Sequence, residues 1–227
     1  MKVGIFVSQV SNSLDITSKI ISSLNNNIPN MNTSKPVIHP QQPVIFLRGK
    51  RVILRPLSER DVPQLTRWIN DPEVRQFIKN TFPMPEGAER DWVESLKKRS
   101  STDIVLGIEI KGKHIGNMGL HGIDWKNQIA TTGALIGEKE YWGKGYGTDA
   151  KMTLLNYAFN TLNMRKIMSR VYSFNERSLA YSLHCGYKEE GRLKQQRFAN
   201  GQYWDEIILG LFKSDWLPYW QKYQNKK

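Results

Sequence analysis

The stretch Tyr141-Trp142-Gly143-Lys144-Gly145-Tyr146-Gly147-Thr148-Asp149-Ala150 is the most informative part of this 227-residue chain. It lies between a β-rich run at residues 129–136 and a helical pattern at 148–162. Its three glycines let successive backbone N–H groups converge, and the following helix adds unpaired N–H groups and its positive end. Such a loop suits phosphate, with Thr148 and Lys144 as further ligands. It matches neither a Walker loop nor a dinucleotide fingerprint, because the required Gly-Lys-Ser/Thr and G-x-G-x-x-G spacings are absent.

The segments around this loop alternate between strand-like and helix-like patterns. We expect strands at 52–57, 104–110, 114–120, 129–136, 165–172, 189–198 and 203–212, and helices at 58–70, 86–99, 148–162 and 176–185. Pro56 stops the first strand, which predicts that this strand lies at an edge of the sheet. The order indicates one α/β domain built on a mixed sheet.

The two ends of the chain differ from this domain. Residues 1–47 are polar and contain prolines at 29, 36, 40 and 43, so we interpret them as an N-terminal extension and linker. A strand at 2–7 and a short helix at 15–24 are expected within it, and the apolar run is too short for a secretory signal. An oligomer-forming arm and an unstructured tail both remain open. We place the domain at 48–217 and a basic C-terminal tail at 218–227.

Composition limits the classes of function. The formal net charge is +12, and it resides mainly in residues 48–227, which favours an anionic partner such as nucleic acid, an acidic membrane or a phosphorylated cofactor. Cys185 is the only cysteine, so a disulfide framework and a thiolate metal cluster are excluded. The four histidines lack metal-ligand spacing, and no apolar run is long enough to span a bilayer. We therefore expect a soluble, cytoplasmic protein without a metal.

The glycine loop closely resembles the acetyl-CoA pyrophosphate loop of the GNAT acetyltransferase superfamily, whose pattern is Gln/Arg-x-x-Gly-x-Gly/Ala. Gly145 and Gly147 fill the two small positions, whereas Trp142 stands where Gln or Arg is usual. A second matching element is Asn175-Glu176-Arg177-Ser178, which opens a helix that ends at Cys185-Gly186-Tyr187.

Two further stretches resemble the branch of this superfamily that acetylates the N-termini of ribosomal proteins. They are Phe198-Ala199-Asn200-Gly201-Gln202-Tyr203-Trp204-Asp205 near the C-terminus and Leu54-Arg55-Pro56-Leu57 with Asp61 near the start of the domain. The resemblance covers roughly residues 48–217.

The resemblance implies a single-domain, mostly antiparallel sheet whose central strands, here 129–136 and 165–172, splay apart and are flanked by helices. It implies acetyl-CoA as cosubstrate, with its pantetheine arm paired to freed N–H groups near Leu135–Gly137 and one N–H stabilising the oxyanion. The implied cofactor contacts are Leu135, Ile136, Gly137, Trp142, Gly143, Lys144, Gly145, Tyr146, Gly147, Thr148, Asn175 and Ser178.

The catalytic side chains depart from the pattern of the relatives. Many relatives carry a glutamate before the loop, yet residues 130–133 contain no carboxylate, so His121 is our candidate general base, with Asp124 and Glu138 as weaker alternatives. Most relatives carry a tyrosine seven residues after the asparagine, where this chain has Ser182. We expect Ser182 to lie near the thioester sulfur, and Tyr181 to point into packing because one helical step turns a side chain by about 100°.

The leading interpretation is an N-acetyltransferase that transfers an acetyl group to a primary amine by direct attack. The amine is the N-terminus of a protein or a small molecule, and the positive charge argues mildly against polyamines. A noncatalytic acyl-CoA-binding module is the alternative, motivated by the missing glutamate and the shifted tyrosine. A nucleic-acid-binding protein rests on the charge alone, without an RNA-binding motif. Homo-oligomerisation is open.

Overall fold

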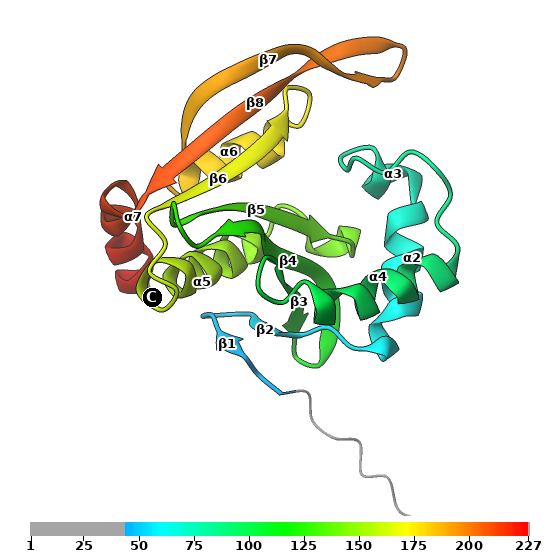
Figure 1. Cartoon of the computed structure of the whole chain (residues 1–227), viewed down its shortest axis with the longest axis horizontal. Coiled ribbons are helices and arrows are strands. Elements are labelled where there is room, and N and C mark those ends of the chain that lie inside the picture. The colour runs from blue at the N-terminus through cyan, green and yellow to red at the C-terminus, as the bar shows by residue number, and fades with distance from the viewer. Residues whose placement is uncertain (1–43, 227) are drawn as a thin grey trace, which may run out of the picture. The chain divides into compact units, whose positions relative to one another are not determined.

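The central feature of the computed structural model, which describes residues 44–226, is an eight-stranded sheet in the order β1-β2-β3-β4-β5-β6-β8-β7 (Figure 1). The expected strand and helix at 2–7 and 15–24 lie outside the described residues. The strands are β1 (Leu47–Arg48), β2 (Ile53–Pro56), β3 (Ile104–Ile110), β4 (Lys113–Asp124), β5 (Ile129–Ile136), β6 (Lys166–Tyr172), β7 (Lys188–Ala199) and β8 (Gln202–Phe212). The helices are η2 (Glu59–Asp61), α2 (Val62–Asn70), α3 (Pro72–Arg75), α4 (Glu86–Lys98), η3 (Lys139–Tyr141), α5 (Tyr146–Asn160), α6 (Glu176–His184) and α7 (Lys213–Asn225).

The pair β5–β6 divides the sheet. It is the only parallel pair in this described sheet, and α5 supplies the crossover that parallel strands require. The two strands pair only over Ile129–Thr131 and Lys166–Met168, and beyond that point they diverge. Figure 1 shows β6, β7 and β8 leaning away from the other strands, with α5 below the opening. The expected splay of the central strands is therefore confirmed.

Helix α5 lies at the centre of the larger core. Leu154, Leu155, Ala158 and Phe159 are fully buried on it, in the same cluster as the apolar side chains of β2–β6 and β8. Because α6 and α7 also contact α5, its apolar positions surround the helix rather than forming one stripe. The helix starts at Tyr146, two residues earlier than expected.

A second, smaller core forms around α2, α3 and α4. Val62, Leu65, Trp68, Val74 and Val93 are its buried members, and Leu135 and Trp142 pack against it. Gly137 allows this packing, since a Cβ at that position would lie 2.0 Å from the Trp68 ring. This core therefore joins the helices to the end of β5.

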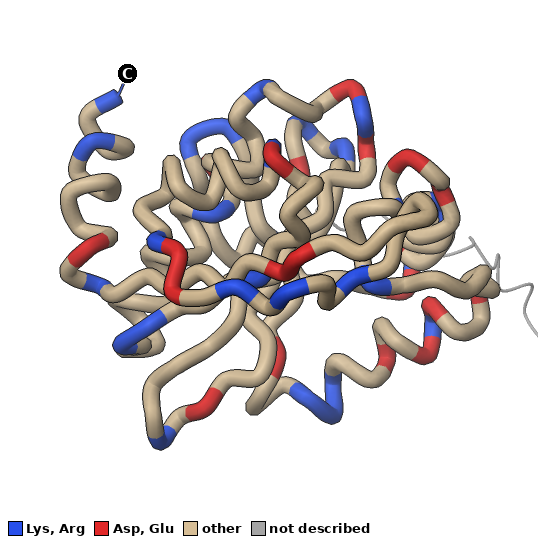
Figure 2. The backbone as a smooth tube through the Cα atoms, turned by 90° about the horizontal axis from the view of Figure 1, so that it is seen from above, with Lys and Arg blue, Asp and Glu red and all other residues tan. Residues whose placement is uncertain are grey.

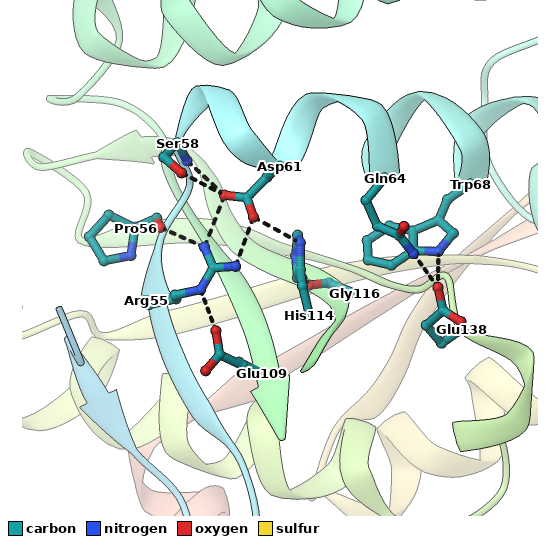
Figure 3. Close-up of polar contacts among 10 residues, drawn as sticks. All are labelled: Arg55, Pro56, Ser58, Asp61, Gln64, Trp68, Glu109, His114, Gly116 and Glu138. Carbon is teal, nitrogen blue, oxygen red and sulfur yellow. Dashed lines mark hydrogen bonds and ion pairs between the residues drawn. The ribbon is translucent and has the colours of Figure 1, made fainter. Parts of the chain in front are cut away.

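A buried ion network attaches α2 to the sheet (Figure 3). The Arg55 guanidinium contacts Asp61 Oδ1 at 2.7 Å and Glu109 Oε2 at 2.7 Å, and His114 Nδ1 lies 3.1 Å from Asp61. Burial alone would raise the pKa of the Asp61 carboxyl, but hydrogen bonds from His114, Arg55 and the Ser58 backbone lower it well below its usual range. The network holds the start of the helical segment in place because each buried charge has a partner.

Most of the segment 218–227, which we expected as a basic tail, belongs to helix α7, which continues to Asn225. Trp216 at the start of this helix is fully buried beside Phe159, and the Tyr223 hydroxyl donates to Asp149. One apolar contact and one polar contact therefore hold the helix against α5.

The edge of the sheet also differs from its prediction. Strand β2 is covered at Ile53 and Leu54 by the short β1, so only its end at Arg55–Pro56 lies on the edge. Pro56 is tolerated there because that side of the strand needs no N–H donor.

The charged residues are spread over the surface. Figure 2 shows Lys and Arg on many elements, interspersed with Asp and Glu. Among the described residues, no helix is long and apolar enough to cross a membrane.

Replacing Asp61 with Asn tests the buried network. The Asp61→Asn variant should lose about 3–5 kcal/mol of unfolding free energy at pH 7, because Arg55 keeps its buried charge while losing a partner. Glu59→Gln, on the same turn but with an exposed side chain, should change it by less than about 1 kcal/mol. Since the folded-state pKa of Asp61 is lowered, its contribution should be present above about pH 4 and fade at lower pH. Urea unfolding measures both, and equal losses in the two variants would contradict the assignment.

Candidate active site

The divergence of β5 and β6 leaves a cavity of about 530 Å³, which we call the slot. Strands β5 and β6 form its two walls, the glycine loop and the start of α5 form one end, and residues of α6 and of the segment 74–79 complete it. The bordering residues are Val74, Phe77, Ile78, Lys79, Thr132–Ile136, Tyr141, Trp142, Gly143, Gly145, Gly147, Thr148, Lys151, Ser169–Tyr172, Asn175, Arg177, Ser178, Tyr181 and Glu206.

The backbone of β5 presents free hydrogen-bonding groups to the slot. The Gly137 N–H donates to Ile115 O at 2.9 Å, on the β4 side, and the Lys166 N–H reaches Gln128 O on the β6 side. Because the polar groups of a strand alternate between its edges, the N–H groups of Ala134 and Ile136 face the slot. By the same alternation the N–H groups of Leu135 and Gly137 face β4, so neither is offered to the slot, contrary to the expected pairing of these two N–H groups with a ligand. The role of Gly137 is to admit Trp68.

Trp142 closes the end of this open edge. Its indole Nε1 donates to Ile136 O at 2.6 Å, so the ring is fixed against the strand. The Arg177 guanidinium lies 4.2 Å from the centre of the same ring and also borders the slot. Trp142 itself carries no charge, and the stacked Arg177 brings a positive charge to this end of the slot. Arg177 could not be assigned to this site from the sequence, because it and Trp142 are 35 positions apart.

The glycine loop has the backbone conformation that its composition predicts. Gly143 and Gly145 have positive φ angles of 71° and 82°, and Gly145 is the N-cap of α5. Gly143, Gly145, Gly147 and Thr148 border the slot, whereas Lys144 and Tyr146 do not. The loop therefore directs backbone groups and Thr148 at the slot.

Arg51 adds a positive charge beside the loop. Its Nη1 donates to Lys144 O at 2.8 Å, and its guanidinium lies 4.0 Å from the centre of the Tyr146 ring. Asp149 fixes the turn that carries Arg51 by accepting the N–H groups of Lys50, Arg51 and Val52. The run of basic residues at 48–51 was visible in the sequence, but only the fold brings it to the loop.

Helix α6 presents Tyr181 to the slot. The Asn175 side chain caps this helix by accepting the Ser178 N–H at 3.1 Å. Ser178 and Tyr181, three residues apart, share the face that borders the slot. Ser182 does not border it: the residue is fully buried, and its hydroxyl oxygen has no hydrogen-bond partner. Ser182 is therefore turned to the core and not to the slot, contrary to expectation. Tyr181 packs against the core, as expected, and also borders the slot.

Lys151 is the other polar side chain deep in the slot. It is 1% exposed, and its Nζ donates to Thr132 Oγ1 at 3.1 Å. Burial lowers the pKa of this amine to about 8. Sequence analysis did not single it out, because a lysine in a helix is ordinarily exposed.

His121 is a residue of β4, where it pairs with Thr131 of β5. Its Nδ1 is 3.0 Å from Asp103 Oδ1, and its side chain is 42% exposed. It does not border the slot, but a Cβ on Gly133 would lie only 3.0 Å from its Nε2. A neutral imidazole that donates from Nδ1 to Asp103 carries its lone pair on Nε2, beside the slot wall.

The other carboxylate candidates are engaged elsewhere. Glu138 accepts hydrogen bonds from Gln64, Arg67 and Trp68 at the end of α2 (Figure 3 draws Gln64 and Trp68), and Asp124 binds Asn127. Neither borders the slot. Between residues 44 and 226, no group of three or more His, Cys, Asp or Glu side chains is placed to hold a metal ion.

Comparison with known proteins agrees with this geometry. Residues 51–188 match the acetyltransferase (GNAT) domain, and the chain belongs to that family. The "Putative ribosomal N-acetyltransferase YdaF" of Bacillus subtilis is 33% identical over 176 residues, which is 74% of this chain and 94% of that protein. Spermidine N(1)-acetyltransferase of Escherichia coli is 27% identical over 168 residues, 73% of this chain and 88% of that protein.

A solved structure shares the fold. The spermidine N-acetyltransferase of Vibrio cholerae, in complex with CoA and spermine, superposes with a TM-score of 0.67 at 24% identity, over 74% of this chain and 98% of that chain. The protein is therefore an acetyltransferase of the GNAT family, and acetyl-CoA is its cosubstrate.

Gly145→Ala tests whether the loop binds the cosubstrate. A Cβ at a φ of 82° strains the loop by about 1–2 kcal/mol and stands among the N–H groups that would face the pyrophosphate, so acetyl-CoA affinity should fall at least about 10-fold. Gly112→Ala is the matched control, because Gly112 has a φ of 81° in the distant β3–β4 turn and open space around it. Calorimetric titration measures both affinities. Wild-type affinity in a folded Gly145→Ala variant would refute the loop assignment.

Proposed function

We propose that this protein acetylates a primary amine of low charge, best represented by the α-amine of a peptide, by direct attack on acetyl-CoA. The observation that supports this proposal is the slot, in which a free strand edge on β5 meets a glycine loop at the N-terminus of α5. The edge suits the amides of a pantetheine arm, and the loop with Arg51 and Arg177 suits its phosphates. We extend these roles to the slot residues Leu135, Ile136, Trp142, Gly143, Gly147, Thr148, Asn175 and Ser178. Lys144 and Tyr146 belong to the same loop outside the slot and hold Arg51 beside it, Lys144 through its carbonyl oxygen and Tyr146 through its ring.

In the proposed reaction the amine nitrogen attacks the thioester carbonyl carbon. An N–H of Ala134 or Ile136 donates to the oxygen that becomes negative. The C–S bond then breaks, its electron pair passes to sulfur, and the nitrogen loses its extra proton. The backbone of β5 thus supplies both positioning and charge stabilisation.

Direct attack is favoured because the thiol of the chain, Cys185, is not placed to act as a nucleophile. Cys185 is fully buried and does not border the slot. Burial raises the pKa of its thiol to about 11, which suppresses the reactive thiolate. The nearby Lys151 amine lowers this pKa, but burial outweighs it, so a covalent acetyl-enzyme on Cys185 is disfavoured.

The missing carboxylate on β5 favours an acceptor that loses its proton easily. An α-amine has a pKa near 8, whereas an alkyl amine such as the lysine side chain has one near 10.4. At pH 7.5 roughly a quarter of an α-amine is neutral, but only about one part in a thousand of an alkyl amine is. An α-amine therefore needs little help from a base.

The charge lining the slot supports the same class of acceptor. Lys79, Arg170 and Arg177 border it, and the one carboxylate there, Glu206, is 3.1 Å from Arg170. A polycation would be repelled by this lining, while a peptide end carries at most one positive charge next to neutral amides. Among the relatives, the Bacillus subtilis protein named a putative ribosomal N-acetyltransferase represents the peptide class, and the spermidine acetyltransferases represent the polycation class.

A panel of acceptors tests this proposal. Peptides with free N-termini should give kcat/KM at least about 10-fold above spermidine at pH 7.5, because more of the peptide amine is neutral and less charge is repelled. Release of CoA is the measurement, and N-acetylated copies of the same peptides are the control. Initial rates varied in both substrates should give intersecting lines, as direct attack requires, and parallel lines would indicate an acetyl-enzyme. A preference for spermidine would overturn the acceptor class.

We further propose that His121 takes the proton released by the amine, held by Asp103. His121→Ala should lower kcat/KM by roughly 10²-fold, because the attacking amine would lose its proton acceptor. His184→Ala, an exposed histidine at the end of α6, is the matched control and should leave kcat/KM unchanged. An unchanged kcat/KM in His121→Ala would transfer the role to water.

A further inference from the structure

Lys151 stands where the two walls of the slot part. The last paired residues of β5 and β6 are Thr131 and Met168, and Thr132 is the first residue beyond them. Lys151 Nζ donates to Thr132 Oγ1, and that hydroxyl donates to Met168 O at 3.1 Å. The amine is thereby tied to the narrow end of the slot, opposite the glycine loop.

The surroundings of this amine are apolar and aromatic. Its Nζ lies 4.7 Å from the centre of the Tyr181 ring and 4.9 Å from that of Tyr187, whose hydroxyl also contacts Thr132. The other titratable group that acts on it is the Cys185 thiol. Within residues 44–226 no carboxylate forms an ion pair with it.

An ammonium buried in this way is costly. A charge taken out of water without an opposite partner destabilises a fold, and the cation–π contacts return only part of that free energy. Arg55, by contrast, has two carboxylates. An apolar side chain would fill the place of Lys151 at lower cost, so its amine has a use beyond packing.

Resting on the proposed function, we infer that Lys151 is the proton donor to the sulfur of CoA as the thioester breaks. The C–S electron pair passes to sulfur, an N–H bond of the Lys151 ammonium breaks, and an S–H bond forms. The products are CoA thiol and a neutral Lys151 amine. The amine regains its proton from water when the thiol leaves and the slot opens to solvent.

Lys151 suits this step better than the neighbouring Tyr181. Burial raises the pKa of Tyr181 well above 10, so proton transfer from its hydroxyl to a thiolate is strongly uphill. Burial lowers the pKa of Lys151 to about 8, close to the pKa of a thiol. The free-energy change of proton transfer from Lys151 to the thiolate is therefore small. Tyr181 then serves as the ring against which the ammonium rests.

The test compares Lys151→Met, Lys151→Arg and the control Lys188→Met, an exposed lysine on β7. Lys151→Met should keep acetyl-CoA affinity within about threefold by calorimetry and melt no lower than wild type, since it removes an unpaired buried charge. Its kcat should fall by about 10²-fold, and the wild-type fall of kcat above about pH 8, where a proton donor is lost, should disappear. Lys188→Met should match wild type.

Lys151→Arg separates proton donation from charge. A guanidinium keeps the charge but releases no proton near neutral pH, so this variant should stay as slow as Lys151→Met. Full recovery in Lys151→Arg, or wild-type kcat and pH profile in Lys151→Met, would overturn the inference. Failure of the proposed function is a different result, in which the wild type itself releases no CoA with any amine.

Discussion

The early end of the β5–β6 pairing is the constraint on which the rest of this structure depends. The two strands share only three residue pairs, and each then continues with an unpaired edge. Buried backbone N–H and C=O groups need partners, so an open edge inside a sheet demands a ligand that can supply them. The glycine loop and the start of α5 lie at the wide end of the opening, and Lys151 lies at its narrow end. A long molecule with amides along its arm and phosphates at one end satisfies both requirements.

Two of the buried charged groups in the domain, those of Arg55 and Lys151, have opposite surroundings. Arg55 is enclosed by Asp61 and Glu109, and His114 completes the group, so that network holds α2 on the sheet without facing the slot. Lys151 has a hydroxyl and two aromatic rings around it. A paired charge stabilises structure, whereas a charge that lacks an opposite partner stays ready to titrate. This contrast distinguishes a structural lysine or arginine from one that can take part in chemistry.

Much of the architecture was predictable from local patterns. The strands 104–110 and 129–136 were predicted at their observed bounds, and the glycine loop was placed correctly between β5 and α5. The failures have physical reasons. Both Ser182 and Tyr181 lie one helical turn from Ser178, so spacing alone could not decide which of them faces the slot. The helix α7 over Lys213–Asn225 was not predicted, because its contacts with Phe159 and Asp149 of α5 join residues far apart in the sequence.

The sequence by itself determined the class of protein, because the order of strands, the glycine loop and the Asn175 motif are local patterns with fixed spacing. Only the tertiary structure decided which side chains meet in the slot. Arg51 reaches a loop 93 positions away, Arg177 stacks on Trp142, and Lys151 meets Thr132 across the crossover. The tertiary structure also showed that Gly137, which we expected to contact the cosubstrate, instead leaves room for the Trp68 ring. Local sequence sets propensity, but the burial and contacts that tune chemistry arise between residues that are distant along the chain.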